Sequence, residues 1–194
     1  MLRPIDVLDV DEGNVWQIRW SEGSSLMEMI ARTGVKRSRF QWLGLVVSIV
    51  VCFGVAALGS RATDPNIDGW YAALRKPPWN PPNWVFGPVW SVLYLLMAVA
   101  AWLVWRRRDF ARVSLPLALF GVQLVLNGLW SVLFFGWHRP DLALIEIVFL
   151  WSAILATMLA FRRVVPLATR LLVPYLLWVS FAAVLNFTIW RMNS

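Results

Sequence analysis

Apolar residues along this 194-residue chain fall into five long runs separated by short polar breaks. Each run has roughly the 20 residues that an α-helix needs to cross a hydrocarbon core of about 30 Å. The runs lack the two-residue alternation of a barrel strand, and a helix satisfies its backbone N–H and C=O groups within its own segment. The pattern predicts an all-α integral membrane protein, a bundle of five transmembrane helices at residues 42–58, 85–105, 113–137, 142–161 and 167–190.

Composition supports a membrane protein. Hydrophobic residues make up 59% of the chain, above the 45–50% that is usual for soluble domains. The chain has 14 tryptophans, a residue that accumulates where an apolar phase meets water. Its net charge of +7 lies in short clusters between the apolar runs, which favours membrane topology over nucleic-acid binding. The single cysteine, Cys52, excludes a disulfide framework, and no metal site is predicted.

Basic residues predict the orientation of the bundle. Ten lysines and arginines, Arg106–Arg108 among them, flank the helix ends on the N-terminal side of the membrane domain, and five flank the other ends. Lysine and arginine concentrate on the cytoplasmic side of membrane proteins. We therefore expect a multi-pass protein of the bacterial cell membrane with a cytoplasmic N-terminus.

The first forty residues differ from the rest of the chain. They hold six acidic and six basic residues and no sustained apolar run, so they do not read as a signal peptide. One interpretation is a polar N-terminal extension, flexible or weakly helical, ahead of a membrane domain at 41–194. The other is that the natural start is Met27 and the upstream residues are not part of the protein.

A proline- and tryptophan-rich segment follows the first apolar run. Four prolines fall within six positions at 77–82, which forbids a continuous helix and favours a stiff, extended backbone. Tryptophans and a tyrosine give this segment flat apolar surfaces. The loop 60–84 is therefore either an aromatic belt that anchors in the lipid headgroups or a rigid cover over one mouth of the bundle.

Three separated motifs resemble one known family. The segment 70–90 has the pattern WYxxLxKPxWxPPxxxFGPVW, the third run contains QLVLNGLWS at 123–131, and the fifth contains PYLLWVSFAAVLN at 174–186. In this order they resemble the translocator protein family, also called the tryptophan-rich sensory or peripheral benzodiazepine receptor family. The resemblance covers about residues 40–193.

The resemblance implies a five-helix protein, commonly a homodimer, that binds protoporphyrin IX or haem as a ligand, with no required cofactor. It also implies binding of isoquinoline carboxamide and benzodiazepine drugs, and a role in porphyrin transport or in stress and oxygen sensing. The ligand pocket would lie inside the bundle, under the first loop. Carried over by position, the ligand-binding residues are Tyr71, Trp79, Pro81, Phe86, Trp90, Tyr94, Gln123, Asn127, Trp130, Ser131, Trp178, Phe181, Ala182 and Leu185.

Helical spacing agrees with this pocket. Trp90 and Tyr94 share one stripe of the second helix, and Gln123, Asn127 and Ser131 are spaced by four in the third. Amides are costly in lipid and should face the bundle interior. The alternative is that these polar residues join helices and that the aromatic residues only pack.

The resemblance also leaves other functions open. Some relatives are thought to promote light-dependent porphyrin breakdown, for which Trp90 and Trp130 would be the reactive partners. No nucleophile–base pair or nucleotide loop supports hydrolytic or phosphoryl chemistry. A scaffold that acts through protein partners is a third possibility. Arg75 and Lys76 could attract porphyrin propionates, and Phe187 stands where animal relatives carry the tyrosine of a sterol-recognition pattern, which argues against tight sterol binding.

Three smaller features complete the picture. Glu146 is an intramembrane carboxylate that either pairs with a group such as Arg139 or reaches the interface or a neighbouring helix. His138 reads as an interfacial residue rather than a haem ligand. Small residues at spacing four in the first run form either an internal helix contact or a dimer face; they are Gly44, Ser48, Cys52 and Ala56.

Overall fold

The computed structural model describes the backbone of residues 21–194 and the side chains of residues 41–194. The described residues are helical and contain no strand: α1 (Ser21–Asn66) with the π-helical turn η1 (Ile67–Tyr71), α2 (Asn83–Trp105), α3 (Ser114–Ser131) with η2 (Val132–Gly136), α4 (Pro140–Arg162) and α5 (Pro166–Asn193). Five spans are long and apolar enough to cross a membrane. The predicted all-α, five-helix membrane fold is confirmed.

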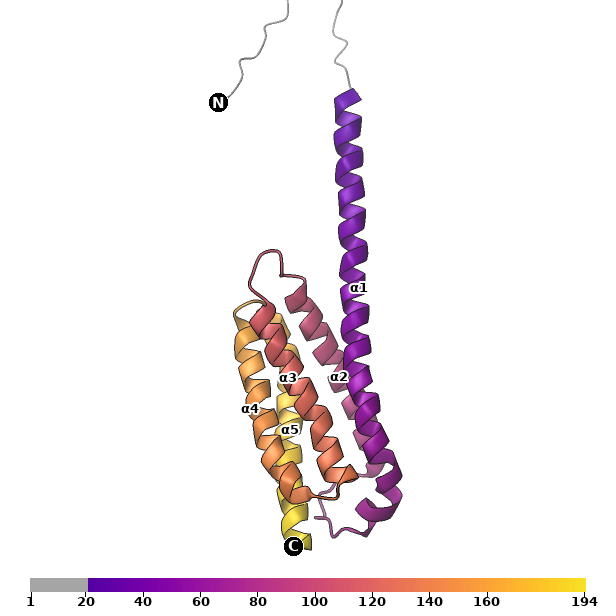
Figure 1. Ribbon diagram of the computed structural model, residues 1–194, viewed down its shortest axis with the longest axis vertical. Helices are drawn as coiled ribbons and strands as arrows, with labels where there is room; N and C mark the ends of the chain where they lie inside the picture. The colour runs from indigo at the N-terminus through magenta and orange to yellow at the C-terminus, as the bar shows by residue number, and fades with distance from the viewer. Residues whose placement is uncertain (1–20) are drawn as a thin grey trace, which may run out of the picture. The chain divides into compact units, whose positions relative to one another are not determined.

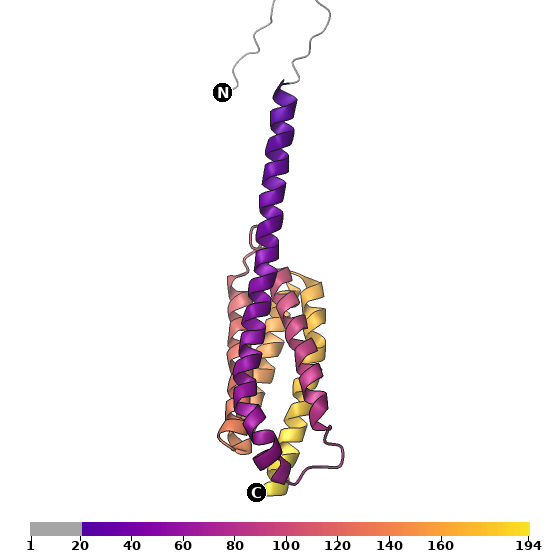
Figure 2. The same cartoon turned by 90° about the vertical axis from the view of Figure 1, so that its right-hand side faces the viewer.

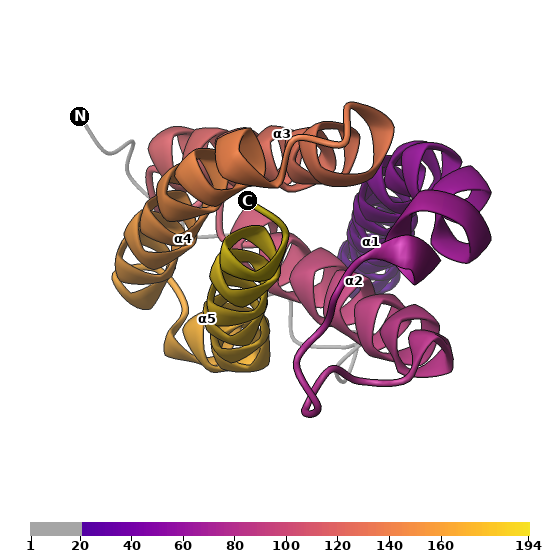
Figure 3. The same ribbon diagram turned by 90° about the horizontal axis from the view of Figure 1, so that it is seen from below.

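Within residues 41–194 the five helices stand side by side (Figures 1 and 2). Seen along the bundle, α1, α2, α5, α4 and α3 follow one another around a ring (Figure 3). The packed pairs α4–α5, α3–α4 and α2–α5 agree with this order. Short connections make sequential helices antiparallel, and prolines begin α4 and α5, where the missing N–H has no helical partner to lose.

The buried core contains large side chains beside very small ones. Met97 and Ala98 of α2, Ile154 of α4 and Tyr175 of α5 have no exposed surface. The alanines let neighbouring helices approach closely, as is usual for helices that pack in lipid. By contrast, exposed positions on the outer faces of the spans carry valine, leucine and phenylalanine. An apolar outer surface of this extent requires a lipid environment.

The small residues of α1 pack inside the molecule. A Cβ atom at Gly44 would collide with the indole of Trp105, and Cys52 is fully buried in the core. The Ser48 hydroxyl donates to the Gly44 carbonyl at 2.9 Å, so this polar group is satisfied within the helix. Of the two interpretations of the stripe, the internal contact is the one that the structure contains.

Two predicted boundaries need correction. The expected loop 60–84 is helical to Ala73, and the irregular segment is only 74–82. The polar side chains of 60–66 indicated a break, but Thr63 donates to the Gly59 carbonyl (2.9 Å) and Asn66 to the Ala62 carbonyl (3.0 Å), which is compatible with continued helix. Of the predicted extension 1–40, residues 21–40 belong to α1, and residues 1–20 lie outside the described residues.

Candidate ligand-binding cavity

A cavity of about 600 Å³ lies inside the bundle and is lined by residues of all five helices and both π-helical turns. This volume falls in the range of about 300–1,000 Å³ that is usual for small-molecule sites. Eleven of the fourteen residues predicted to bind a ligand line it: Tyr71, Phe86, Trp90, Tyr94, Asn127, Trp130, Ser131, Trp178, Phe181, Ala182 and Leu185.

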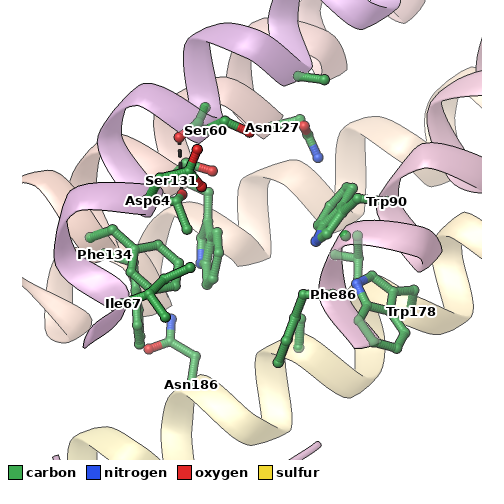
Figure 4. A pocket seen from close by; sticks show the side chains of 18 of the residues that line it. Ser60, Asp64, Ile67, Phe86, Trp90, Asn127, Ser131, Phe134, Trp178 and Asn186 are labelled. Atoms are coloured by element: carbon green, nitrogen blue, oxygen red, sulfur yellow. Dashed lines mark hydrogen bonds between the residues drawn. The ribbon is translucent and has the colours of Figure 1, made fainter. Parts of the chain in front are cut away.

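Aromatic rings form two facing walls. On one side the ring centroids of Trp90 and Tyr94 are 5.6 Å apart. Phe86 meets Trp178 edge-on there, with ring centroids 5.9 Å apart. On the other side Trp130 stacks on Phe134 at 5.0 Å and 18°. Figure 4 shows Phe86, Trp90 and Trp178 across the opening from Phe134. Each wall is held by contacts between rings, so its flat surfaces are present before any ligand arrives.

Asn127 connects three helices at the cavity wall. Its side-chain oxygen accepts a hydrogen bond from the Tyr94 hydroxyl of α2, and its amide nitrogen donates to the Tyr175 hydroxyl of α5 at 3.1 Å. All three side chains are buried. The Asn127 amide therefore lines the cavity and also links three helices by hydrogen bonds. The two interpretations of the polar stripe, as pocket lining and as a link between helices, both apply to this residue.

Other polar groups on the wall differ in how well they are paired. The indole nitrogen Nε1 of Trp130 is buried and has no hydrogen-bond partner in the described part of the chain. With the oxygen and nitrogen of its amide assigned to suit their neighbours, Asn186 donates to the Pro140 carbonyl and accepts from the Leu144 N–H, each at 3.1 Å. Among the lining residues given by the structure, Asp64 alone is charged. The Trp130 N–H is thus enclosed in the wall rather than open to the cavity, and Asp64 supplies the carboxylate of the lining.

Three predicted residues lie off the wall. Trp79 and Pro81 belong to the irregular loop 74–82, none of whose residues lines the cavity, although the ring of Trp79 packs edge-on against Phe181 at 5.9 Å. Gln123 is buried deeper, where its Nε2 approaches the Met97 sulfur at 4.0 Å. The loop therefore braces the cavity wall from behind, and Gln123 serves packing between α2 and α3.

One whole side of the cavity was absent from the predicted set. Residues of α1 at spacing four and three line it, namely Phe53, Ala57, Ser60 and Asp64. The sequence motifs of the family begin after this helix, so they gave no indication of these positions. The 53/57/60/64 periodicity is a signal that could have found them. A Cβ atom at Gly59 would lie 3.2 Å from Ser131 Oγ, which shows how closely α1 approaches α3 here.

The end of α1 is fastened to the connection between η2 and α4. His138 stacks on Trp70 with ring centroids 4.4 Å apart, and its Nε2 lies 2.9 Å from Asn66 Oδ1. His138 has a φ of 56°, in the left-handed region that costs a non-glycine residue energy. These two contacts hold the ring in place, and the position of His138 at the membrane interface stays a prediction.

The basic residues of the loop have other partners. Lys76 donates to the carbonyls of Tyr71 (2.5 Å) and Ala72 (3.2 Å), and its ammonium lies 4.6 Å from the centre of the Tyr71 ring. The backbone N–H and C=O of Arg75 both bond the side chain of Asn193 at 2.9 Å. Neither Arg75 nor Lys76 lines the cavity.

Glu146 has neither of its expected environments. Arg139 is paired with Asp141 at 2.6 Å, and this hydrogen-bonded carboxylate raises the pKa of the guanidinium above its usual value. Glu146 itself is only 6% exposed, and neither carboxylate oxygen has a hydrogen-bond partner in the described part of the chain. The predictions that it pairs with Arg139, reaches the interface or bonds another helix are wrong, because the residue faces the packed interior of the bundle.

Fold and cavity together define the class: a multi-pass membrane protein that encloses an aromatic, small-molecule-sized cavity within five helices. More particularly, the chain belongs to the TspO/MBR family, whose model matches residues 48–191. It is 45% identical over 157 residues to Tryptophan-rich protein TspO of Chlorobaculum tepidum, covering 79% of this chain and 98% of that protein. It is 42% identical over 138 residues to the Translocator protein of Homo sapiens (70% and 82% covered). It is 41% identical over 142 residues to the Tryptophan-rich sensory protein of Cereibacter sphaeroides (72% and 88% covered).

Proposed function

We propose that this protein binds a tetrapyrrole such as protoporphyrin IX in the cavity and acts in its transport or in sensing it. The names of two relatives, a translocator protein and a tryptophan-rich sensory protein, point to these two roles. The observation that carries the proposal is the pair of facing aromatic walls around about 600 Å³. A flat, largely apolar macrocycle gains most from flat apolar surfaces on both sides.

The polar groups of the wall would fix the orientation of the ligand. The indole N–H groups of Trp90 and Trp178, two lining residues, would be donors for a carbonyl or carboxylate oxygen on the ligand. Asp64 would accept from a pyrrole or amide N–H and repel a propionate, so we expect the acidic edge of a porphyrin to point away from α1. The same indole donors would serve the carbonyl of an isoquinoline carboxamide or a benzodiazepine, which we propose as competing ligands.

The test is a titration of the purified protein in detergent with protoporphyrin IX, in the dark, by tryptophan fluorescence quenching. We expect saturable binding at one site per chain. Trp90→Ala removes part of one wall and should weaken binding about tenfold, the effect of losing about 1.4 kcal/mol. Ala182→Thr adds a methyl and a hydroxyl group to the wall and should also weaken binding.

The matched control is Val125→Ala, at a position of α3 that is 70% exposed on the outer face of the bundle. It should bind like the wild type. Quenching that never saturates would exclude the cavity as the binding site. Equal affinity of all three variants for protoporphyrin IX would exclude it as well. A membrane scaffold acting through protein partners would then account better for the chain.

Light-dependent porphyrin degradation is a second candidate, favoured by one observation. Trp90 and Trp130, the two indoles predicted to take part, both line the cavity and lie on its opposite walls. A bound macrocycle would touch both. Illumination of the protoporphyrin complex should then give a new product by absorption and mass spectrometry, lost in Trp130→Phe with dark binding retained. A product formed equally by free porphyrin in detergent would exclude this activity.

A further inference from the structure

Glu146 is a buried carboxylic acid inside a membrane-spanning helix, and the cavity does not account for it. It lies on α4 beside Ile147, which lines the cavity, but its own side chain is not part of the wall. It is 6% exposed, and both carboxylate oxygens are shielded from solvent and without a partner in the described part of the chain.

An ionised carboxylate in this position has no compensation. Moving such an ion from water into a low-dielectric interior carries a large desolvation cost, and a substantial part of it remains after relaxation. The nearest basic residue in sequence, Arg139, is paired with Asp141. A neutral carboxylic acid avoids the cost, since only its ordinary polar groups are then buried.

The titratable groups that interact with Glu146 in the described part of the chain include no basic residue. Tyr175 of α5 is close enough to Glu146 to interact electrostatically, and Tyr175 in turn interacts with Tyr94 of α2 and Cys52 of α1. None of these groups is cationic, so none favours a carboxylate. Tyr175 is hydrogen-bonded to Asn127, which lines the cavity. Hydrogen bonds therefore join the cavity wall to Tyr175, and none of them reaches the acid in the described part of the chain.

We propose that Glu146 is an intramembrane proton-binding site: it holds a proton at neutral pH and releases it to water only when water enters through the cavity side of α4. Ile147 and Leu150, apolar residues of α4 that line the cavity, would form the barrier to water. Proton occupancy and filling of the cavity are then linked, because a ligand that excludes water favours the protonated acid. The inference does not depend on which ligand the cavity takes.

The first measurement is infrared absorption of the wild-type protein at neutral pH in heavy water. A carbonyl band of a protonated carboxylic acid should be present and should shift when glutamate is labelled with ¹³C. The band should be lost in Glu146→Gln and kept in Asp141→Asn, which alters an exposed, ion-paired acid on the same helix. A hydrophobic carbodiimide, which reacts with protonated carboxyl groups, should modify Glu146 and leave Asp141 unmodified.

Absence of the glutamate-sensitive band in the wild type would overturn the proposal, even if Glu146→Gln failed to fold. The route of water is tested by a matched pair, Ile147→Ala on the cavity wall and Ile145→Ala on the outer face, where residue 145 is 60% exposed. On raising the pH, the band should disappear at lower pH in Ile147→Ala than in the wild type and at unchanged pH in Ile145→Ala. Equal behaviour of the two variants would refute entry from the cavity.

Discussion

At the scale of single residues, the Asn127 side chain lines the cavity and makes two buried hydrogen bonds. It accepts from Tyr94 and donates to Tyr175, so both ends of one amide are used by buried phenols on other helices. A buried hydroxyl without a partner costs about 1–3 kcal/mol. The contribution of Asn127 to stability is therefore separable from any contribution to binding.

Asn127→Leu should lower the stability of the detergent-solubilised protein by a few kcal/mol, because two buried hydroxyl groups lose their partner at once. Thermal unfolding followed by circular dichroism measures it. Tyr94→Phe should cost stability in the wild type and much less in the Asn127→Leu background, since the bond it breaks is already gone. Equal costs in the two backgrounds would mean that the Tyr94–Asn127 bond carries no stability.

Most of the residues predicted to bind a ligand line the cavity, but many other lining residues escaped prediction for a physical reason. Trp90, Trp130 and Trp178 could be predicted because they lie in distinctive motifs on regular helices. Asp64 could not, because polar residues after the first apolar run indicated a loop rather than a helical wall. Trp79 was placed on the wall by its motif, although it packs behind Phe181.

At the scale of elements, the end of α1 is the least regular part of the cavity wall. The helix widens into η1, and the contacts of His138 with Trp70 and Asn66 join it to the connection before α4. The spans of the four helices from α2 onwards could be predicted to within a few residues, because length and hydropathy suffice for a span. The π-helical turns could not, since they follow from tertiary contacts that periodicity does not encode.

His138→Asn should loosen the end of α1. Asparagine tolerates the left-handed backbone at residue 138, so the change removes the ring that stacks on Trp70 without adding strain. Amide hydrogen exchange measured by mass spectrometry should rise several-fold in peptides covering 59–71. Trp137→Ala, at an exposed neighbouring position, is the control and should leave that segment unchanged. Unchanged exchange in His138→Asn would show that the stack does not hold the helix.

At the scale of the whole molecule, charge asymmetry predicts how the bundle lies in the membrane. The connection between α2 and α3 carries Arg106, Arg107 and Arg108, whereas α5 ends near a single basic residue, Arg191. Arg106 and Arg108 lie over the rings of Trp102 and Trp105, at 4.6 and 3.7 Å, as is suitable for a membrane–water interface. The α2–α3 connection is therefore expected in the cytoplasm.

Single-cysteine labelling tests this orientation in a Cys52→Ala background. Ser194→Cys in intact cells should react with a membrane-impermeant maleimide, whereas Phe110→Cys, at an exposed position after α2, should react only after lysis. Wild-type Cys52 is buried and should react in neither case. The reverse pattern would place the N-terminal side of the bundle outside the cell.

Asn193 joins the last turn of α5 to the proline-rich segment 74–82 by hydrogen bonds. Its side chain bridges the N–H and the C=O of Arg75 at 2.9 Å each, much as a neighbouring β-strand would. A purification tag, antibody or fusion partner attached after Ser194 would pull on this bridge and so disturb the segment that braces Phe181. Binding assays on C-terminally tagged protein would then measure the affinity of an altered cavity. A purification tag is therefore better attached at the N-terminus.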